Sequence, residues 1–346
     1  ILPWAGSRMY VDTDIPNVDD RKALKDGVTE IANWIFFGFR SQLDQLNWLL
    51  PESKTGAFDK LNNIQLNVAY PDWVTDNDSL TAFYKDLDIQ STDNYMIMRE
   101  KLSNFYLDKS AARIPDSPPR DRGDFGSFVG ITNAWYQPQM NSITFPEGIL
   151  QEPFYTSNYP LAAIFGSLGV ISGHELTHGF DDEGVQWDGV GGLNNWMDNT
   201  STTSFNAMAQ CVIDQYSAYC PYEGVCLNGA NTQGENIADN GGMQAAFKAF
   251  KAYESLNGGD PRLPGFGSMY NSEQLFFLMF GNVWCDMEYT KEMYEQEIAV
   301  DVHSPPLYRV LGSLQNFPAF RNAFNCPIDD LYTPTKHCDV WTSRPF

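Results

Sequence analysis

A short segment in the middle of the chain carries residue types that can bind a metal ion and move a proton. Positions 174–178 read His-Glu-x-x-His, and an apolar run over 161–171 precedes them. Because residues four apart lie on one face of a helix, His174 and His178 can direct ring nitrogens at one metal ion. Glu175, one position further round, can reach the open coordination position of that ion. The pattern predicts a zinc peptidase, against the alternative of two polar positions on an amphipathic helix.

A catalytic zinc site also needs a third protein ligand, with the fourth position left for water. The best candidate is Glu235, which begins a predicted helix. Asp239 lies one turn further on the same face, where it can accept a hydrogen bond from the second nitrogen of a ligand histidine. Thr232 and Glu235 also have the spacing of a capping box, so without the histidines a capping role for Glu235 would be preferred.

Several other motifs agree with this site. The chain contains Asn-Ala at 133–134, Gly-Glu-Asn-Ile-Ala-Asp-Asn at 234–240, Asp-Val-His-Ser-Pro at 301–305 and Cys-Asp-Val-Trp at 338–341. Together with the segment around His174, and in the same order, they resemble the neprilysin and endothelin-converting enzyme family of zinc endopeptidases. The resemblance covers the whole chain, but it matches only the C-terminal half of the family's large extracellular part.

The resemblance implies a role for each residue of the metal site. His174, His178 and Glu235 would bind one Zn²⁺ ion. Glu175 would be the general base that takes a proton from water and passes it to the leaving amine. Asp239 would support catalysis as the partner of a ligand histidine.

The same resemblance implies a peptide-binding site around the metal. His303 would stabilise the tetrahedral intermediate and Arg309 would bind the peptide backbone, although outside this motif they would be a structural histidine and a surface cation. Asn133 and Ala134 match a pair on an edge strand, which can bind an extended peptide through main-chain hydrogen bonds. An apolar pocket for the residue after the cleaved bond would be lined by Phe154, Ile171 and Trp284; the alternative is that these three are core residues.

Apolar periodicity places the expected secondary structure. A segment rich in proline and charge at 114–124 indicates a linker. After it, 128–136 and 142–145 predict a β-hairpin beside the metal helix. Helices are predicted at 19–50, 56–63, 79–104, 161–180, 204–219, 232–253 and 273–294. The expected fold is therefore mainly α with a small β-sheet (α+β).

The resemblance refines this fold class to a zincin-like, thermolysin-like catalytic domain with part of a helical covering domain. We place the covering segment and linker at 1–115 and the zinc peptidase domain at 116–346. The predicted activity is hydrolysis of short peptides on the amino side of hydrophobic residues. One alternative is a zinc-bound but catalytically silent cell-surface receptor, although neither Glu175 nor His303 is lost. Another is a structural metal site, which would be closed and rich in cysteine.

The cysteines favour an oxidising compartment. Cys220 and Cys226, six positions apart, are expected to form a local disulfide. The resemblance pairs Cys211 with Cys338. It pairs the two remaining cysteines, Cys285 and Cys326, with the N-terminal half of the family, which implies a second, disulfide-linked chain or a polypeptide cleaved before Ile1.

Composition restricts the partners. The formal charge of −22 would repel nucleic acid and anionic lipid. No apolar run approaches the roughly 20 residues of a membrane-spanning helix. Asn77 and Asn199 head glycosylation sequons. We therefore expect an extracellular protein, secreted or at the cell surface, that acts on peptides; a homodimer stays open.

Overall fold

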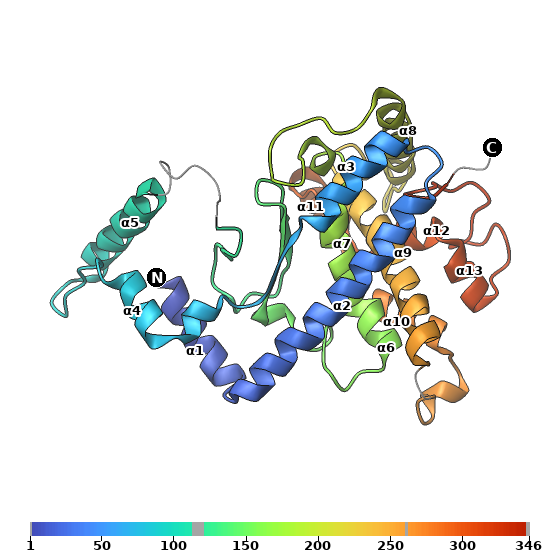
Figure 1. The fold of residues 1–346 in the computed structure, drawn as a ribbon. Coiled ribbons are helices and arrows are strands. Elements are labelled where there is room, and N and C mark those ends of the chain that lie inside the picture. Colours follow the sequence, from blue (N-terminus) through green and yellow to red (C-terminus); the bar gives the residue numbers. More distant parts are fainter. Residues whose placement is uncertain (1, 113–120, 260–261, 344–346) are drawn as a thin grey trace.

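The computed structural model describes residues 2–112, 121–259 and 262–343, and most of this part is helical (Figure 1). The chain begins with α1 (Pro3–Asp14), the long α2 (Val18–Gln45) and α3 (Pro51–Asn62). The further α-helices are α4 (Asn77–Tyr84), α5 (Tyr95–Ala112), α6 (Leu161–Ile164), α7 (Val170–His178), α8 (Asn199–Ser217), α9 (Gln233–Asn257), α10 (Ser272–Val283), α11 (Lys291–Val300), α12 (Pro306–Gln315) and α13 (Pro318–Phe324). The predicted α-rich class with a small sheet is confirmed.

The sheet has three strands in the order β1-β3-β2. β1 (Gln65–Ala69) runs parallel to β3 (Ser142–Pro146), and β2 (Trp135–Gln137) pairs antiparallel with β3. The predicted hairpin is therefore present, but its first strand was expected from 128 and begins only at 135. Asn133 and Ala134 precede β2, because ladder pairing with β3 starts at Trp135. β2 is an edge strand, but the Asn-Ala pair that was expected on such a strand lies just before it.

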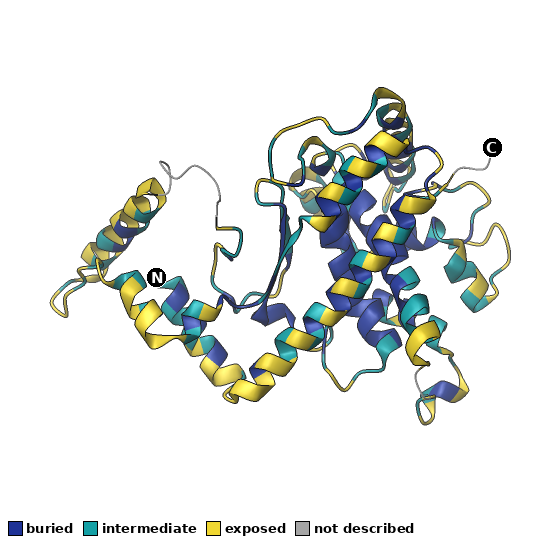
Figure 2. Cartoon of the chain, in the orientation of Figure 1, coloured by how far each residue is buried: buried dark blue, intermediate teal, exposed yellow. Residues whose placement is uncertain are grey.

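α2 carries one apolar face across the body of the molecule. Asn17 caps its first turn by accepting a hydrogen bond from the Asp19 N–H. Its buried side, including Ile35 and Phe39, packs against α7 and α9 (Figure 2). α4 and α5 instead lie away from this body (Figure 1). The linker at 114–124 and the domain boundary after residue 115 fall mostly outside the described residues, so the domain division stays a prediction.

Several predicted helices differ in detail from the structure: the helix predicted over 19–50 ends at Gln45, and the segment 79–104 contains α4 and the start of α5 with a break between them. Residues 161–178 form a continuous helical run in which a π-turn, Phe165–Gly169, separates α6 from α7. The helix predicted over 273–294 is divided, because α10 ends at Val283 and Thr290 caps a new helix by accepting from the Met293 N–H. The chain between them carries Cys285.

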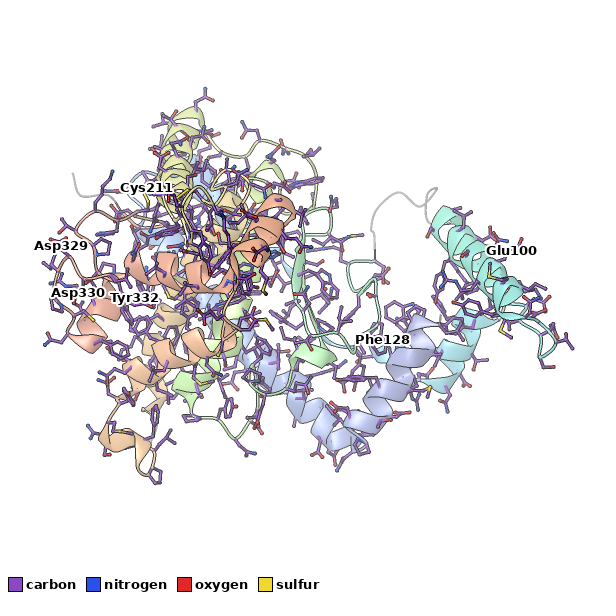
Figure 3. The ribbon with its side chains drawn as sticks, turned by 180° about the vertical axis from the view of Figure 1, so that it is seen from behind. Glu100, Phe128, Cys211, Asp329, Asp330 and Tyr332 are labelled. Carbon is purple, nitrogen blue, oxygen red and sulfur yellow. A yellow bond between two sulfur atoms is a disulfide. The ribbon has the colours of Figure 1, made fainter. Side chains whose placement is uncertain are left out.

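Two disulfides connect distant and local parts of the chain. Cys211 on α8 (Figure 3) is bonded to Cys338, with an S–S distance of 2.05 Å, and Cys220 is bonded to Cys226. Both pairings agree with the expectation. Cys285 and Cys326 have no disulfide partner within the described residues.

The sequon residues Asn77 and Asn199 are the first residues of α4 and α8 and are both exposed, and their glycosylation stays a prediction. Within the described ranges, no helix combines the length and apolar character that crossing a bilayer requires.

Candidate active site

The crossing of α7 and α9 brings the predicted metal ligands together. A side chain at Gly173 would lie 2.5 Å from the carbonyl oxygen of Gly242, and one at Gly242 would lie 2.3 Å from the backbone nitrogen of His174. The two helices can therefore touch backbone to backbone only because both positions are glycine. This close contact places the inner face of α7 directly opposite the first turns of α9.

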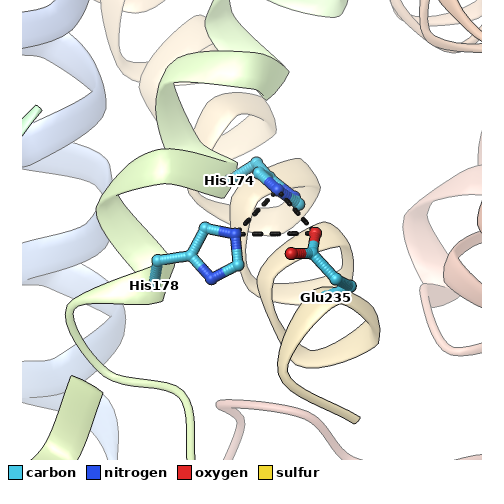
Figure 4. Close-up of side chains that lie close together, drawn as sticks. All are labelled: His174, His178 and Glu235. Carbon is cyan, nitrogen blue, oxygen red and sulfur yellow. Dashed lines mark hydrogen bonds and ion pairs between the residues drawn. The ribbon is translucent and has the colours of Figure 1, made fainter. Parts of the chain in front are cut away.

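Three donor atoms from these helices point at one another (Figure 4). The Nε2 atoms of His174 and His178 are 3.0 Å apart, and Glu235 Oε2 lies 3.2 Å from the first and 3.6 Å from the second. All three lie within 4.8 Å of one another. Among the described residues, Glu235 Oε2 is buried without a hydrogen-bond partner of normal geometry.

Two aspartates orient the histidine rings. His178 Nδ1 lies 2.6 Å from Asp181 Oδ2, and His174 Nδ1 lies 2.8 Å from Asp239 Oδ1. In each pair the carboxylate accepts a hydrogen bond from the Nδ1–H of a neutral imidazole, which leaves a free lone pair on Nε2. Two lone pairs and a carboxylate oxygen that converge on one point can bind a metal ion between them. This His₂Glu set, with one side facing a cavity, fits a catalytic zinc ion.

The electrostatics of the cluster also favour a positive charge at its centre. Burial works against protonation of His178, yet the carboxylates of Asp181 and Glu235 hold its pKa well above its usual value. Burial likewise works against ionisation of Glu235, but the adjacent imidazoles hold the pKa of this carboxyl far below its usual range. The cluster therefore prefers ionised carboxylates around a cation.

Glu175 is buried beside the ligands and lines the same cavity. Burial raises its pKa, while the neighbouring His174 and His178 oppose the shift. A carboxyl with a raised pKa that faces a cavity is suited to proton transfer.

Arg309 forms a bidentate ion pair with Asp239. Its Nε lies 2.7 Å from Asp239 Oδ2 and its Nη2 lies 2.6 Å from Oδ1. The Arg309 charge lowers the pKa of Asp239 against the effect of burial. The guanidinium carbon stacks 3.8 Å from the centre of the Trp284 ring. Asp239 thus fixes both a metal-site histidine and a cation that lines the cavity.

His303 enters the site from the loop between α11 and α12. Its Nδ1 lies 2.7 Å from Asp301 Oδ1, which also accepts the His303 backbone N–H at 2.8 Å. This turn directs Nε2 inward, to 3.3 Å from Glu235 Oε2.

A cavity of about 480 Å³ opens over these groups. It is lined by the predicted ligands and by Glu175 and His303. Its walls also include each residue predicted to contact substrate, namely Asn133, Ala134, Phe154, Ile171, Trp284 and Arg309. Asp239 lies behind this lining and is 1% exposed.

Two details differ from the sequence-based interpretation. Thr232 makes no side-chain cap at the start of α9, so the expected capping box is wrong; its side chain accepts from Asn236 Nδ2, and Glu235 turns to the histidines. Asp181 was given no role, although it lies only three residues after His178 and could have been considered as a partner of its ring. Asp301 was likewise overlooked, despite its place in the motif of His303.

Comparison with known proteins agrees with this geometry. Models of peptidase family M13 match residues 133–340 and residues 1–71. Neprilysin-11 of Caenorhabditis elegans is 36% identical over 99% of this chain and 39% of its own length. Human endothelin-converting enzyme 1 is 38% identical over 98% of this chain and 43% of its own length.

Solved structures show the same fold. The zinc metalloprotease Zmp1 of Mycobacterium tuberculosis, in complex with an inhibitor, has a TM-score of 0.82 and 32% identity, covering 97% of this chain and 49% of that one. The Haemonchus galactose containing glycoprotein complex has a TM-score of 0.84 and 33% identity, and the match covers 98% of this chain and 53% of that one. This chain spans about half the length of these proteins, or less. The chain is a member of peptidase family M13, with neprilysins and endothelin-converting enzyme among its relatives.

Proposed function

We propose that the protein is a zinc-dependent endopeptidase with one Zn²⁺ ion held by His174, His178 and Glu235. The convergence of their three donor atoms within 4.8 Å, open to the cavity, carries the proposal. When bound, zinc would act as a Lewis acid that polarises the scissile carbonyl and activates water.

Glu175 would move the proton in this reaction. It stands next to His174 in the sequence and faces the cavity in which a peptide bond would lie. In its ionised form it can accept a proton from the attacking water, and in its neutral form it can donate that proton to the leaving amine.

His303 and Arg309 would bind the reacting peptide. With the Asp301 carboxylate at Nδ1, a protonated His303 can donate from Nε2 to an oxygen that gains negative charge. Arg309 uses two N–H groups on Asp239, and its remaining donors can hold a backbone carbonyl of the substrate.

The cavity walls support a preference for peptides with an apolar side chain after the cleaved bond. The exposed Asn133 and the free edge of β2 can pair with an extended peptide through main-chain hydrogen bonds. Phe154, Ile171 and Trp284 form apolar wall beside the ligands. Cleavage would then occur on the amino side of hydrophobic residues.

The test is hydrolysis of a quenched fluorescent peptide with a bulky apolar residue after the scissile bond. We expect cleavage that a chelator abolishes and added zinc restores, and slower cleavage of a matched peptide with glycine at that position. Zinc binding without cleavage of either peptide would instead support the silent receptor. Absence of zinc binding would overturn the proposal.

The environment of the protein is part of this proposal. Two disulfides favour an oxidising, extracellular setting. We also propose that Cys285 and Cys326 pair with cysteines outside this sequence.

A further inference from the structure

Lys60 on α3 is completely buried, which is unusual for a lysine. Its Nζ donates hydrogen bonds to the carbonyl oxygens of Gly184, at 2.5 Å, and Trp187, at 2.7 Å. Burial lowers the pKa of Lys60 to about 7, and the carboxylates of Asp181 and Asp188 oppose this effect. Burying an amine costs free energy unless it is hydrogen-bonded. The two carbonyl groups that Lys60 binds are therefore the part of the structure that this side chain stabilises.

Those carbonyls belong to the turn that follows the metal-binding helix. The Gly184 N–H donates to Asp181 Oδ1 at 2.6 Å, while Asp181 Oδ2 lies 2.6 Å from His178 Nδ1. Gly184 therefore joins Lys60, through its carbonyl, to the carboxylate that orients His178. A side chain at Gly184 would lie 1.9 Å from the His178 carbonyl oxygen, so the turn is pressed against the end of α7.

A second branch connects Lys60 with the wall of the cavity. The Lys60 carbonyl accepts from Asn141 Nδ2 at 3.0 Å, and the same nitrogen donates to the Gly189 carbonyl at 2.9 Å. Asn141 Oδ1 accepts the hydroxyl of Tyr136, which lies on β2 and lines the cavity. One buried position thus connects α3, the turn after α7 and the edge strand.

We propose that Lys60 is a positioning residue of the metal site, which holds the turn 181–187 so that Asp181 fixes the ring of His178. The inference rests on the proposed function. It also assigns a part in the site to α3, which lies more than a hundred residues before His178 in the sequence. The competing interpretation is that Lys60 only satisfies two buried carbonyls and supports the fold.

Zinc binding by the full-length protein separates these two roles. The variants are Lys60→Met, Asp181→Asn, the double variant, and Lys54→Met as a control. Lys54 lies on the same helix and donates to the Asp44 carbonyl, away from the site. The readouts are the zinc dissociation constant, from competition with a chromophoric chelator, and Tm with and without zinc.

Residues that contact metal ligands directly change affinity by about 10- to 100-fold when replaced. Lys60 acts through Gly184 and is two contacts beyond Asp181, so we expect Lys60→Met to weaken zinc binding by less, about three- to tenfold. Added to Asp181→Asn, the same change should cost less than about twofold, because its route to His178 is already broken. Lys54→Met should bind zinc as the wild type does.

Equal zinc affinity in wild type and Lys60→Met, with Tm lowered equally with and without zinc, would overturn the inference. Equal effects of Lys60→Met in the wild-type and Asp181→Asn backgrounds would also overturn it. If Lys60→Met does not fold, Lys60→Gln, which keeps an N–H donor, takes its place; failure of both to fold would establish the structural role. A wild-type protein that binds no zinc would refute the proposed function itself, a separate outcome.

Discussion

Single residues in the site differ in role according to which of their atoms face the cavity. His174 and His178 direct Nε2 at Glu235, and their Nδ1 atoms are used by aspartates. Glu175 belongs to the same helix but contributes no atom to this cluster of three. The proposed metal binding and the proposed proton transfer therefore fall on different residues.

The substitution Glu175→Gln tests that separation. It keeps shape and volume but removes the carboxylate, so kcat/KM for the apolar peptide should fall by about 10²- to 10⁴-fold. Zinc affinity should stay close to the wild-type value, because Glu175 is not among the three converging ligands. Glu100→Gln on α5, far from the site (Figure 3), is the matched control and should keep full activity. A Glu175→Gln variant with near-normal kcat/KM would contradict the assignment of the general base.

At the scale of elements, a seam joins α1 to the end of β3. Val129 donates its N–H to Ser7 Oγ on α1 and accepts the Gly148 N–H through its carbonyl. Glu147, directly after β3, is buried in this seam, and among the described residues neither of its carboxylate oxygens has a hydrogen-bond partner. Burial raises its pKa to about 7, and the Asp14 charge adds to the shift.

Because Glu147 is buried in this seam, the free energy of unfolding should fall as the pH rises. Between the usual glutamate pKa and about 7, Glu147 is protonated in the folded chain and ionised in the unfolded one, so the folded state binds the extra proton. Stability is then lost from about pH 4.5 upward and stays low above pH 7, by at most about 3 kcal/mol at 1.36 kcal/mol per unit. Urea unfolding at pH 5 and pH 8 should show this loss in wild type and a smaller one in Glu147→Gln. Parallel curves for the two proteins would show that Glu147 does not titrate in this range.

At the scale of the whole molecule, the unpaired cysteines are the feature that points to a partner. Cys285 is exposed and Cys326 is half-buried, whereas the other four cysteines form disulfides. This chain also spans about half the length of its relatives, or less. We therefore ask whether Cys285 and Cys326 form disulfides with cysteines of a further segment or chain.

Mass spectrometry of the natively isolated protein addresses this question. If Cys285 and Cys326 are paired as proposed, a maleimide should label neither cysteine before reduction and both after it. Peptides that contain them should be found joined to foreign peptides under non-reducing conditions. Complete labelling of both thiols in the native protein would show that they are free.

The sequence by itself determined the features that depend on local geometry. The spacing of His174 and His178 becomes a shared direction as soon as the segment is helical, because side chains four apart lie on one face. The same reasoning located the main helices and the hairpin, and the motifs around Glu235 and His303 supported the family. Boundaries were less well predicted, since the start of β2 and the break after α10 depend on neighbouring elements.

Only the tertiary structure decided which distant residues meet. Asp239 meets His174 only because α7 and α9 cross, whereas the contact of His178 with Asp181, three residues further along the chain, is local. Lys60 could not be distinguished from a surface lysine in the sequence, because its burial depends on how α3 packs against the turn after α7. Such contacts arise from packing between segments far apart in the chain, and periodicity reports only on the faces of each segment.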